Sequence, residues 1–305
     1  MSTRNVNIAI CIATYKRVDW LIELLNSLIT QKLDTNIIIK IIIIDNDPEK
    51  SAESSVELFF SDKDINYVYD MQPEKNIALT RNKALFYAQE SDYIALVDDD
   101  EWVTQEWLQN LLSTSQRFNA DVVFGPAIPV LPETVPDWLI KGDFFSAGKR
   151  LITGSPQQHG ASNNTLIHNS KFKSELKFAP EYGLTGGEDT ELFHRLYLIG
   201  AKLVWCDEAI VYEHVTENRL NIIWLSKRSL RSGQINALIF YKNKTFVIAL
   251  SQILKHISLL IATILIFPFA LLFGKATWVR VLRKIMNNFG YLSMLMGNYA
   301  YQEYK

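Results

Sequence analysis

The stretch IIIKIIIIDND, residues 37–47, decides how the rest of the chain is interpreted. Seven isoleucines surround a single lysine, and the run ends abruptly in Asp45, Asn46 and Asp47. A β-branched run this continuous favours a strand, and burial of both faces of a strand is typical of a parallel sheet with helices on each side. We therefore expect a buried parallel strand over 37–44, with Asp45 and Asp47 at its carboxyl end.

Apolar runs and helical periodicities alternate on both sides of this strand. Further strands are predicted from short apolar runs, and helices from apolar residues spaced three and four apart. This alternation predicts an α/β domain with a mostly parallel sheet flanked by helices, whereas residues 125–177 are expected to form loops and short strands. The other expected strands are 7–13, 66–69, 93–97, 121–124 and 202–206, and the expected helices are 19–28, 76–89, 102–118 and 186–198.

The predicted strand 93–97 runs directly into four acidic residues, Asp98 to Glu101. Residues i and i+2 of an extended chain project to the same side, so Asp98 and Asp100 are expected to face one pocket. Carboxylates this close repel each other unless a cation compensates, and oxygen ligands suit Mg²⁺ or Mn²⁺. Because ligands bind at the carboxyl ends of strands in open α/β sheets, the pattern favours a metal–phosphate site. The alternative is an acidic turn before a helix, where the macrodipole favours negative charge.

Composition excludes several classes of protein. With 48% apolar and 12% aromatic residues in 305, the chain is too apolar to be disordered throughout. Thirteen glycines exclude a collagen-like chain, and two cysteines, Cys11 and Cys206, exclude a disulfide scaffold or a zinc knuckle. The first apolar stretch is short and lacks a small-residue cleavage site, so we expect no signal peptide and a cytosolic catalytic portion.

The net charge of −2 conceals a strong asymmetry along the chain. Residues 1–217 carry 19 basic and 32 acidic residues, whereas residues 218–305 carry 12 basic residues and one acidic residue. A basic segment suggests an anionic partner, and this segment is also the most apolar part of the chain. The combination favours a membrane surface over nucleic acid.

The C-terminal third therefore raises the question of membrane attachment. Residues 219–234 have the pattern of a basic amphipathic helix that lies on a lipid surface, covers an acceptor site or simply faces water. Residues 257–273 carry no charge and would span about 25 Å as a helix, slightly less than the ~30 Å hydrocarbon core. We expect a membrane-embedded hairpin or interfacial helix pair with both ends cytosolic; one spanning helix and a buried soluble helix are the alternatives. The predicted domains are 1–217 (catalytic), 218–244 (amphipathic linker) and 245–305 (membrane-associated).

Five motifs occur in order along the first two thirds of the chain: IAICIATYKR, IIIIDND, NIALTRNKAL, YIALVDDDEW and GGEDTELFHRL. In this order and spacing the chain resembles the family 2 glycosyltransferases, inverting enzymes of the GT-A fold, over residues 6–215. The resemblance implies a nucleotide-sugar donor (UDP-sugar favoured), Mg²⁺ or Mn²⁺, and a saccharide or lipid-linked saccharide acceptor. No Gln-x-x-Arg-Trp element of processive synthases is present, so we expect single transfer. The expected role is surface polysaccharide biosynthesis at the cytoplasmic face of the membrane.

The resemblance also implies roles for individual residues. Asp189 matches the catalytic base, Asp100 the main metal ligand, and Asp98 a position near both ribose and metal. His214 is a further candidate metal ligand. The nucleotide pocket is expected to contain Thr14, Tyr15, Arg17, Asp45, Arg81, Asn82, Asp98 and Asp99, and the acceptor side Glu188, Asn163, Asn164 and Trp138.

Each of these candidates has a structural alternative. Glu188 and Asp189 follow two glycines and would equally suit the N-terminus of a helix. The alternatives for the others are a structural or exposed side chain for His214, a polar turn for Asn163 and Asn164, and core packing rather than sugar stacking for Trp102 and Trp138. For the protein as a whole, the alternatives are a nucleotidyltransferase, which would want a Gly-rich phosphate loop, and a membrane-anchored nucleotide-sugar-binding module.

Overall fold

The computed structural model describes residues 4–146, 151–169, 172–241 and 245–295, which form two compact units. The first, here called the α/β unit, comprises the chain up to Pro129 together with Ala147–His214. The second, the helical unit, comprises Val130–Ser146 and the chain from Val215 onward. This division differs from the predicted boundaries at 217 and 244, because residues 130–146 pack with the C-terminal helices; the predicted domain limits stay predictions.

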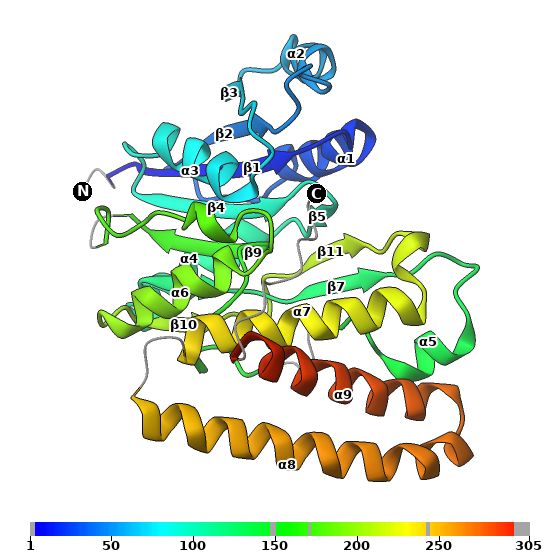
Figure 1. Cartoon of the computed structure of the whole chain (residues 1–305). Coiled ribbons are helices and arrows are strands. Elements are labelled where there is room, and N and C mark those ends of the chain that lie inside the picture. The colour runs from blue at the N-terminus through cyan, green and yellow to red at the C-terminus, as the bar shows by residue number, and fades with distance from the viewer. Residues whose placement is uncertain (1–3, 147–150, 170–171, 242–244, 296–305) are drawn as a thin grey trace. The chain divides into compact units, whose positions relative to one another are not determined.

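An eight-stranded sheet forms the centre of the α/β unit, in the order β3-β2-β1-β4-β9-β6-β10-β8 (Figure 1). Four neighbouring pairs are parallel, and β9 and β8 run antiparallel to their neighbours. The predicted α/β fold with a mostly parallel sheet is therefore confirmed. The strands are β1 (Val6–Thr14), β2 (Ile37–Asp45), β3 (Asn66–Met71), β4 (Tyr93–Asp98), β6 (Val122–Phe124), β8 (Pro156–Gln157), β9 (Asn164–His168) and β10 (Leu203–Trp205).

Helices cover both faces of this sheet, which explains why β1 and β2 are so continuously apolar. Ile8, Ile10 and Ile12 of β1 point into a core shared with α1, α2 and α4, whereas Ala9 and Cys11 point into a second core shared with α3 and α6. Both faces thus exclude water, and a polar residue is tolerated on neither. The helices are α1 (Val18–Ile29), α2 (Glu53–Phe60), α3 (Ile77–Tyr87), α4 (Trp107–Phe118) and α6 (Glu188–Leu198), with a 3₁₀ turn η1 at Pro180–Tyr182.

A small second sheet corrects one sequence-based expectation. Residues 102–118 were expected to be one helix, but β5 (Glu101–Val103) is a strand and the helix begins only at Trp107. The sheet has the order β5-β11-β7, with β7 at Ala127–Val130 and β11 at Val211–His214. Trp102 lies opposite Tyr212 in the antiparallel β5–β11 pair. Cross-strand pairing with a distant segment, invisible to local periodicity, therefore overrides the helical pattern here.

The helical unit is built from α5 (Asp137–Gly142), α7 (Ile222–Tyr241), α8 (Phe246–Ala270) and α9 (Lys275–Leu295), with 3₁₀ turns η2 (Glu217–Arg219) and η3 (Leu271–Phe273). The backbones of α7 and α9 approach closely at two glycines. A Cβ on Gly233 would lie 2.0 Å from the Asn287 carbonyl oxygen, and one on Gly290 would lie 2.0 Å from that of Leu230. Glycine is therefore required at this helix crossing. The predicted linker 218–244 is mostly α7, and residues 242–244 lie outside the described chain.

Candidate active site

The carboxyl ends of three neighbouring parallel strands bring the predicted polar residues to one edge of the sheet. Thr14 at the end of β1 is in register with Asp45 at the end of β2, and Ala13 is in register with Asp98 at the end of β4. Since parallel strands end at the same edge, residues more than 80 positions apart in sequence lie side by side. The predicted position of the site at a strand edge therefore matches the geometry.

Arg17 joins the loop after β1 to the acidic turn after β4. Its Nη1 donates to Asp99 Oδ1 at 3.0 Å and to Asp100 Oδ2 at 2.9 Å. The other Asp99 oxygen accepts from the Thr14 hydroxyl at 2.9 Å and from the Tyr15 amide at 3.3 Å. Asp99 therefore fixes the loop 14–17, while Asp100 accepts a hydrogen bond from the same Arg17 nitrogen.

Arg81 connects this acidic turn to a segment almost ninety residues further along the chain. Its Nη2 donates to Asp98 Oδ1 at 2.8 Å, and its Nη1 donates to Glu188 Oε1. The negative charge of Asp189 also raises the pKa of Arg81, after the larger effects of burial, which lowers it, and of Asp98 and Glu188, which raise it. Asp98, Glu188 and Asp189 therefore gather around one buried guanidinium.

Two glycines aim the start of α6 at this cluster. Gly186 and Gly187 have φ of 76° and 94°, in the left-handed region that other residues rarely adopt. The turn brings Glu188 and Asp189 into the first turn of α6, as expected. Asp189 Oδ1 accepts from the backbone amide of Thr190 at 2.6 Å, which fixes one carboxylate oxygen.

The acidic turn does not have the geometry assumed from an extended chain. Asp99 and Asp100 form a turn between β4 and β5, so Asp98 and Asp100 meet different arginines. Glu101 turns inward, where its Oε2 accepts from the Asp98 amide at 2.9 Å and its Oε1 from Asn163 Nδ2 at 2.8 Å. The assumption that Asp98 and Asp100 lie two residues apart on one extended strand is therefore wrong. Both carboxylates nevertheless lie at the same strand edge.

The cluster contains six carboxyl groups, from Asp98 to Glu101 and from Glu188 and Asp189, but only two arginines, Arg17 and Arg81, within the described residues. Burial raises the pKa of Asp99 to about 7 against the opposing effect of Arg17. Burial, and then the neighbouring Asp189, raises the pKa of Glu188, and burial with Asp98 raises that of Glu101. Glu188 Oε2 is buried without a hydrogen-bond partner. A divalent cation fits such a set of hard oxygen donors, although no preformed group of three ligands occurs in the described chain.

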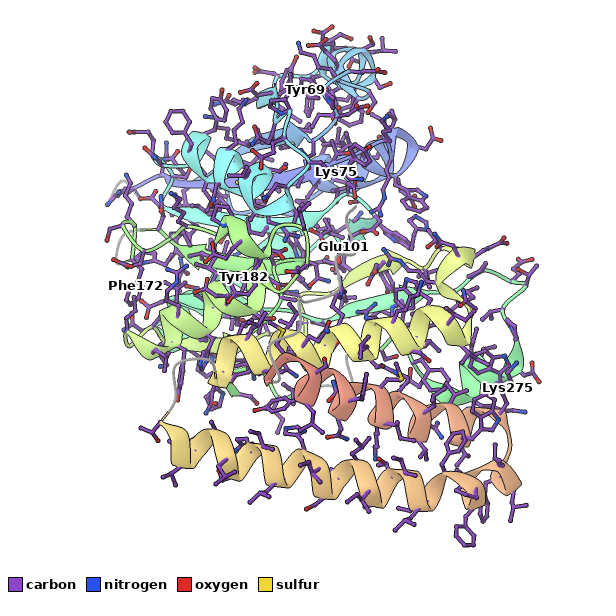
Figure 2. All side chains as sticks on the ribbon, in the orientation of Figure 1. Tyr69, Lys75, Glu101, Phe172, Tyr182 and Lys275 are labelled. Carbon is purple, nitrogen blue, oxygen red and sulfur yellow. The ribbon has the colours of Figure 1, made fainter. Side chains whose placement is uncertain are left out.

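An exposed aromatic ring with two lysines lies beside the same loop. Tyr15 is 40% exposed, and the ammonium groups of Lys16 and Lys75 lie 5.5 and 5.6 Å from its ring centre. Figure 2 labels Lys75 and Glu101 on this unit. An accessible ring flanked by cations suits a nucleobase with its phosphates.

Three predicted contact residues are committed to the protein itself. Asp45 is buried and accepts from Tyr69 (labelled in Figure 2) at 2.8 Å and from the Ala52 amide at 3.0 Å. The Asn82 amide pairs with the Phe178 backbone in both directions at 2.8 Å. Asn164 is 1% exposed and bonds to Trp107 Nε1 and to two backbone carbonyls. The side chains of all three are therefore held by hydrogen bonds to other parts of the protein. Their expected ligand contacts stay predictions.

His214 is one of four rings that lie in a row, and the Arg17 guanidinium lies beside the first of them, Trp20. Its Nε2 is 2.8 Å from Glu23 Oε2, and its ring stacks on Trp20 at a centroid distance of 5.1 Å. Trp102 follows at 4.6 Å from His214, and Tyr212 stacks on Trp102 at 5.4 Å. The Arg17 guanidinium lies 5.5 Å from the Trp20 ring. We call Trp20, His214, Trp102 and Tyr212 the aromatic row; it adjoins the acidic turn, since the His214 amide donates to the Asp100 carbonyl at 2.9 Å.

Sequence reasoning missed Trp20, Tyr212 and His159. Trp20 and Tyr212 lie on different elements and meet only through His214 and Trp102. Burial and the charge of His194 lower the pKa of His159, whereas the charge of Asp189 raises it. No local signal in the sequence marks these residues. Trp138, predicted on the acceptor side, lies in the helical unit, where its ring is 5.7 Å from that of Phe144 and 4.6 Å from Lys275 Nζ.

A mostly parallel sheet with acidic residues at its strand ends, an exposed ring beside lysines and a carboxylate at a helix start defines a glycosyltransferase of the GT-A type. The family model "Glycosyl transferase family 2" matches residues 9–175. The chain therefore belongs to glycosyl transferase family 2, and the predicted resemblance and fold are confirmed.

Known proteins support this assignment at different levels. The succinoglycan biosynthesis protein ExoM of Rhizobium meliloti is 34% identical over 232 residues, covering 76% of this chain and 74% of ExoM. Among solved structures, the mannosyltransferase PcManGT from Pyrobaculum calidifontis, in complex with GDP-Man and Mn²⁺, has a TM-score of 0.67 at 13% identity and covers 98% of this chain and 89% of its own. TarS of S. aureus, in complex with UDP, has a TM-score of 0.53 at 17% identity, covering 96% and 93%. At such identities the structures show the fold alone.

Proposed function

We propose that this glycosyltransferase moves a sugar from a nucleotide-sugar donor to an acceptor hydroxyl with inversion, and that Asp189 is the base. The observation that carries the proposal is the position of Arg81, which holds Asp98 of the donor edge and Glu188, the neighbour of Asp189, through one guanidinium. Inversion requires an acceptor oxygen and a departing diphosphate on opposite sides of one sugar carbon. An acid on each side of Arg81 supplies that arrangement.

Each residue then has a task that its surroundings support. Asp189 accepts the acceptor proton through the carboxylate oxygen that Thr190 does not hold, and general-base catalysis of this kind contributes about 10²–10⁴ in rate. Arg17, Lys16 and Lys75 offer positive charge to the diphosphate, and Tyr15 a face for the base. Arg81 positions the two acidic groups without touching the transferred sugar.

Asp98 and Asp100 are the residues that would hold Mg²⁺ or Mn²⁺, with His214 as a third candidate. A bound divalent ion would neutralise charge on the leaving diphosphate. The surplus of buried carboxylates and the unpaired Glu188 oxygen support this assignment. PcManGT was solved with Mn²⁺, which is consistent with it.

For the substrates we propose a UDP-sugar donor and a saccharide acceptor, linked to a lipid, in polysaccharide biosynthesis. The similarity to ExoM, named for succinoglycan biosynthesis, supports the role in polysaccharide biosynthesis. The UDP in TarS supports a UDP-sugar donor, whereas the GDP-Man in PcManGT makes a GDP-sugar the donor to test against it. The aromatic row adjoins Asp100 and offers ring surfaces on which a sugar can stack, so we assign it to the acceptor side. Thermal-shift measurements with UDP-, GDP- and dTDP-sugars and Mn²⁺ identify the donor, because a ligand of the native state raises its melting temperature.

Two substitutions separate catalysis from binding. Asp189→Asn should retain donor affinity and lose roughly 10² or more in kcat, because the base is gone and the donor site is intact. Asp100→Asn should instead weaken donor binding in the presence of Mn²⁺. Asp62→Asn, at an exposed acid outside the site, is the matched control and should change neither. Equal, mild effects of both site variants would favour a nucleotide-sugar-binding module, and release of diphosphate rather than a nucleoside diphosphate would favour a nucleotidyltransferase.

We further propose attachment to the cytoplasmic face of the membrane through the helical unit, with one sugar transferred per encounter. One helix, Val247–Phe273, is long and apolar enough to cross a membrane by length and composition. Only 6% of its most apolar 18 residues are buried, whereas the core helix of a soluble protein is mostly buried. An acceptor anchored in a lipid would meet an enzyme held at the same surface.

A further inference from the structure

The apolar surface of α8 is unusually complete. The most apolar 18 residues within Val247–Phe273 have a mean hydropathy of 2.4. Its partly buried positions follow one narrow stripe at spacings of three and four residues, and the large apolar side chains elsewhere on the helix are exposed. The stripe consists of the partly buried Ala249, Gln252, Ile253, His256, Leu260, Thr263 and Phe267 and the buried Ala270.

The stripe is covered by α9, which runs antiparallel beside α8 (Figure 1). Close to the middle of α8, His256 Nδ1 lies 2.7 Å from Asn288 Oδ1, and the His256 ring stacks on Tyr291 at 3.6 Å. Near its end, the Phe267 ring lies 6.3 Å from that of Trp278. These contacts fix the register of the two helices over the second half of α8.

This register places a group of cations beside the middle of α8. Arg280, Arg283 and Lys284 lie between the two contacts, at positions of α9 that run alongside the central turns of α8. Arg280 and Lys284 are exposed. If α8 crossed a bilayer with this packing intact, these three charges would be carried to the hydrocarbon midplane, where charged side chains are strongly disfavoured.

From this juxtaposition we infer that α8 lies in the plane of the membrane, within one leaflet, and that α9 lies parallel to it at the level of the lipid head groups. The inference rests on the membrane attachment proposed above. Packed helices are about 8–10 Å apart, and in-plane helices bury their apolar face about 5–10 Å into the head-group boundary. When α8 lies at that depth, α9 is level with the lipid phosphates, and α7, which packs on α9, lies further from the hydrocarbon.

The partner that fits this surface is a bilayer containing anionic lipids. Residues 218–305 carry 12 basic residues and one acidic residue, and the exposed Arg280 and Lys284 of α9 lie beside the apolar helix. Each lysine or arginine near an anionic surface strengthens binding by about fivefold at moderate ionic strength. Apolar burial and charge attraction therefore act on the same face.

Depth measurements at three positions on one face of α8 test the orientation. Val247, Ser258 and Phe269 are all exposed and follow each other at 11-residue intervals within α8, so they share a face, and the outer two are roughly 33 Å apart along the helix. Each is replaced by cysteine in the full-length Cys11→Ala/Cys206→Ala chain, spin-labelled, and bound to phosphatidylcholine–phosphatidylglycerol vesicles. Ser232→Cys on α7 is the water-side control.

An in-plane helix should give the same depth at all three positions and none at Ser232→Cys. A deep label at Ser258→Cys with shallow labels at the other two, on opposite sides of the vesicle wall, would establish a spanning helix and overturn the inference. Failure to bind vesicles at all would overturn it as well. Transfer to a water-soluble acceptor, measured without vesicles, reports the glycosyltransferase function separately.

A charge reversal tests the role of α9. Lys284→Glu should weaken partitioning onto these anionic vesicles at least fivefold and leave transfer to a water-soluble acceptor unchanged. Lys32→Glu, at an exposed lysine of the α/β unit, makes the same change in net charge and should leave partitioning unaltered. Equal losses in both variants would mean that net charge, rather than α9 at the head groups, governs binding.

Discussion

Arg81 shows how much of this site depends on a single side chain. Its side chain is 11% exposed and is held between Asp98 and Glu188, so its positive charge is compensated from two directions. Burying a guanidinium is costly, and carboxylates on both sides offset that cost only while all three groups are present. The residue therefore links the end of β4 to the start of α6 both mechanically and electrostatically.

We expect Arg81→Ala to lower the free energy of unfolding by about 3–5 kcal/mol, because it leaves Glu188 as an uncompensated buried charge. Denaturant unfolding measures the change. Arg81→Met combined with Glu188→Gln should recover part of the loss, since no buried charge then lacks its partner. If the double variant is as unstable as the sum of its single changes, the pair is not coupled and the bridging role is wrong.

The aromatic row gives a second prediction at this scale. Trp102→Ala should raise the KM for the acceptor about three- to tenfold and leave the donor KM unchanged, because it removes one stacking surface and no donor contact. Trp102→Phe should restore most of the affinity. Phe86→Ala, at an aromatic residue that is 63% exposed and outside the row, serves as the control in steady-state kinetics. A rise in the donor KM alone would place the row on the wrong side of the reaction.

At the level of elements, the parallel strands β1 and β2 owe their stability to burial on both faces. Cys11 in β1 and Cys206 just after β10 are both buried and free. Burial raises the pKa of Cys11 to about 12 from its ordinary 9.0 and also raises that of Cys206. The reactive thiolate is therefore scarce as well as enclosed.

In the native protein at pH 8 neither thiol should react with iodoacetamide within hours, because the higher pKa alone lowers the thiolate fraction of Cys11 about a thousandfold. Both should react rapidly in urea, as mass spectrometry would show. Ser113→Cys on the exposed side of α4 provides a site that labels at once. Rapid native labelling of Cys11 would mean that β1 is not covered on the face of α3 and α6.

At the scale of the whole molecule, the two units should respond separately to damage. Gly233→Ala places a Cβ 2.0 Å from the Asn287 carbonyl oxygen, so α7 and α9 must move apart. We expect a loss of about 1–3 kcal/mol in the stability of the helical unit and weaker vesicle binding. Transfer to a water-soluble acceptor should continue, because the residues proposed for catalysis lie in the α/β unit. Ser232→Ala on the exposed side of α7 is the control, and parallel loss of both activities would contradict independent units.

Much of the fold was predictable because its signal is local. Composition and spacing within a few residues were enough to predict the isoleucine strand 37–44, the helix before Ala88 and the strand 93–97. Two segments were misread: Trp102–Val103 was expected to be helical, and the strand β11 at Val211–His214 was not expected, because each takes its conformation from pairing with the other. The antiparallel strand β9 in the middle of the sheet likewise depends on partners far away in sequence.

For the site, the sequence alone determined which residue types gather at the strand ends, because the period of a strand and the acids that follow it are encoded within a few residues. Only the tertiary structure decided their partners: that Arg81 joins Asp98 to Glu188, that Asn82 and Asn164 brace the backbone, and that four rings from three elements form one row. The physical reason is that hydrogen bonds and ring contacts act over a few ångströms of space, and the sheet brings together residues that are separated by up to two hundred positions in the chain.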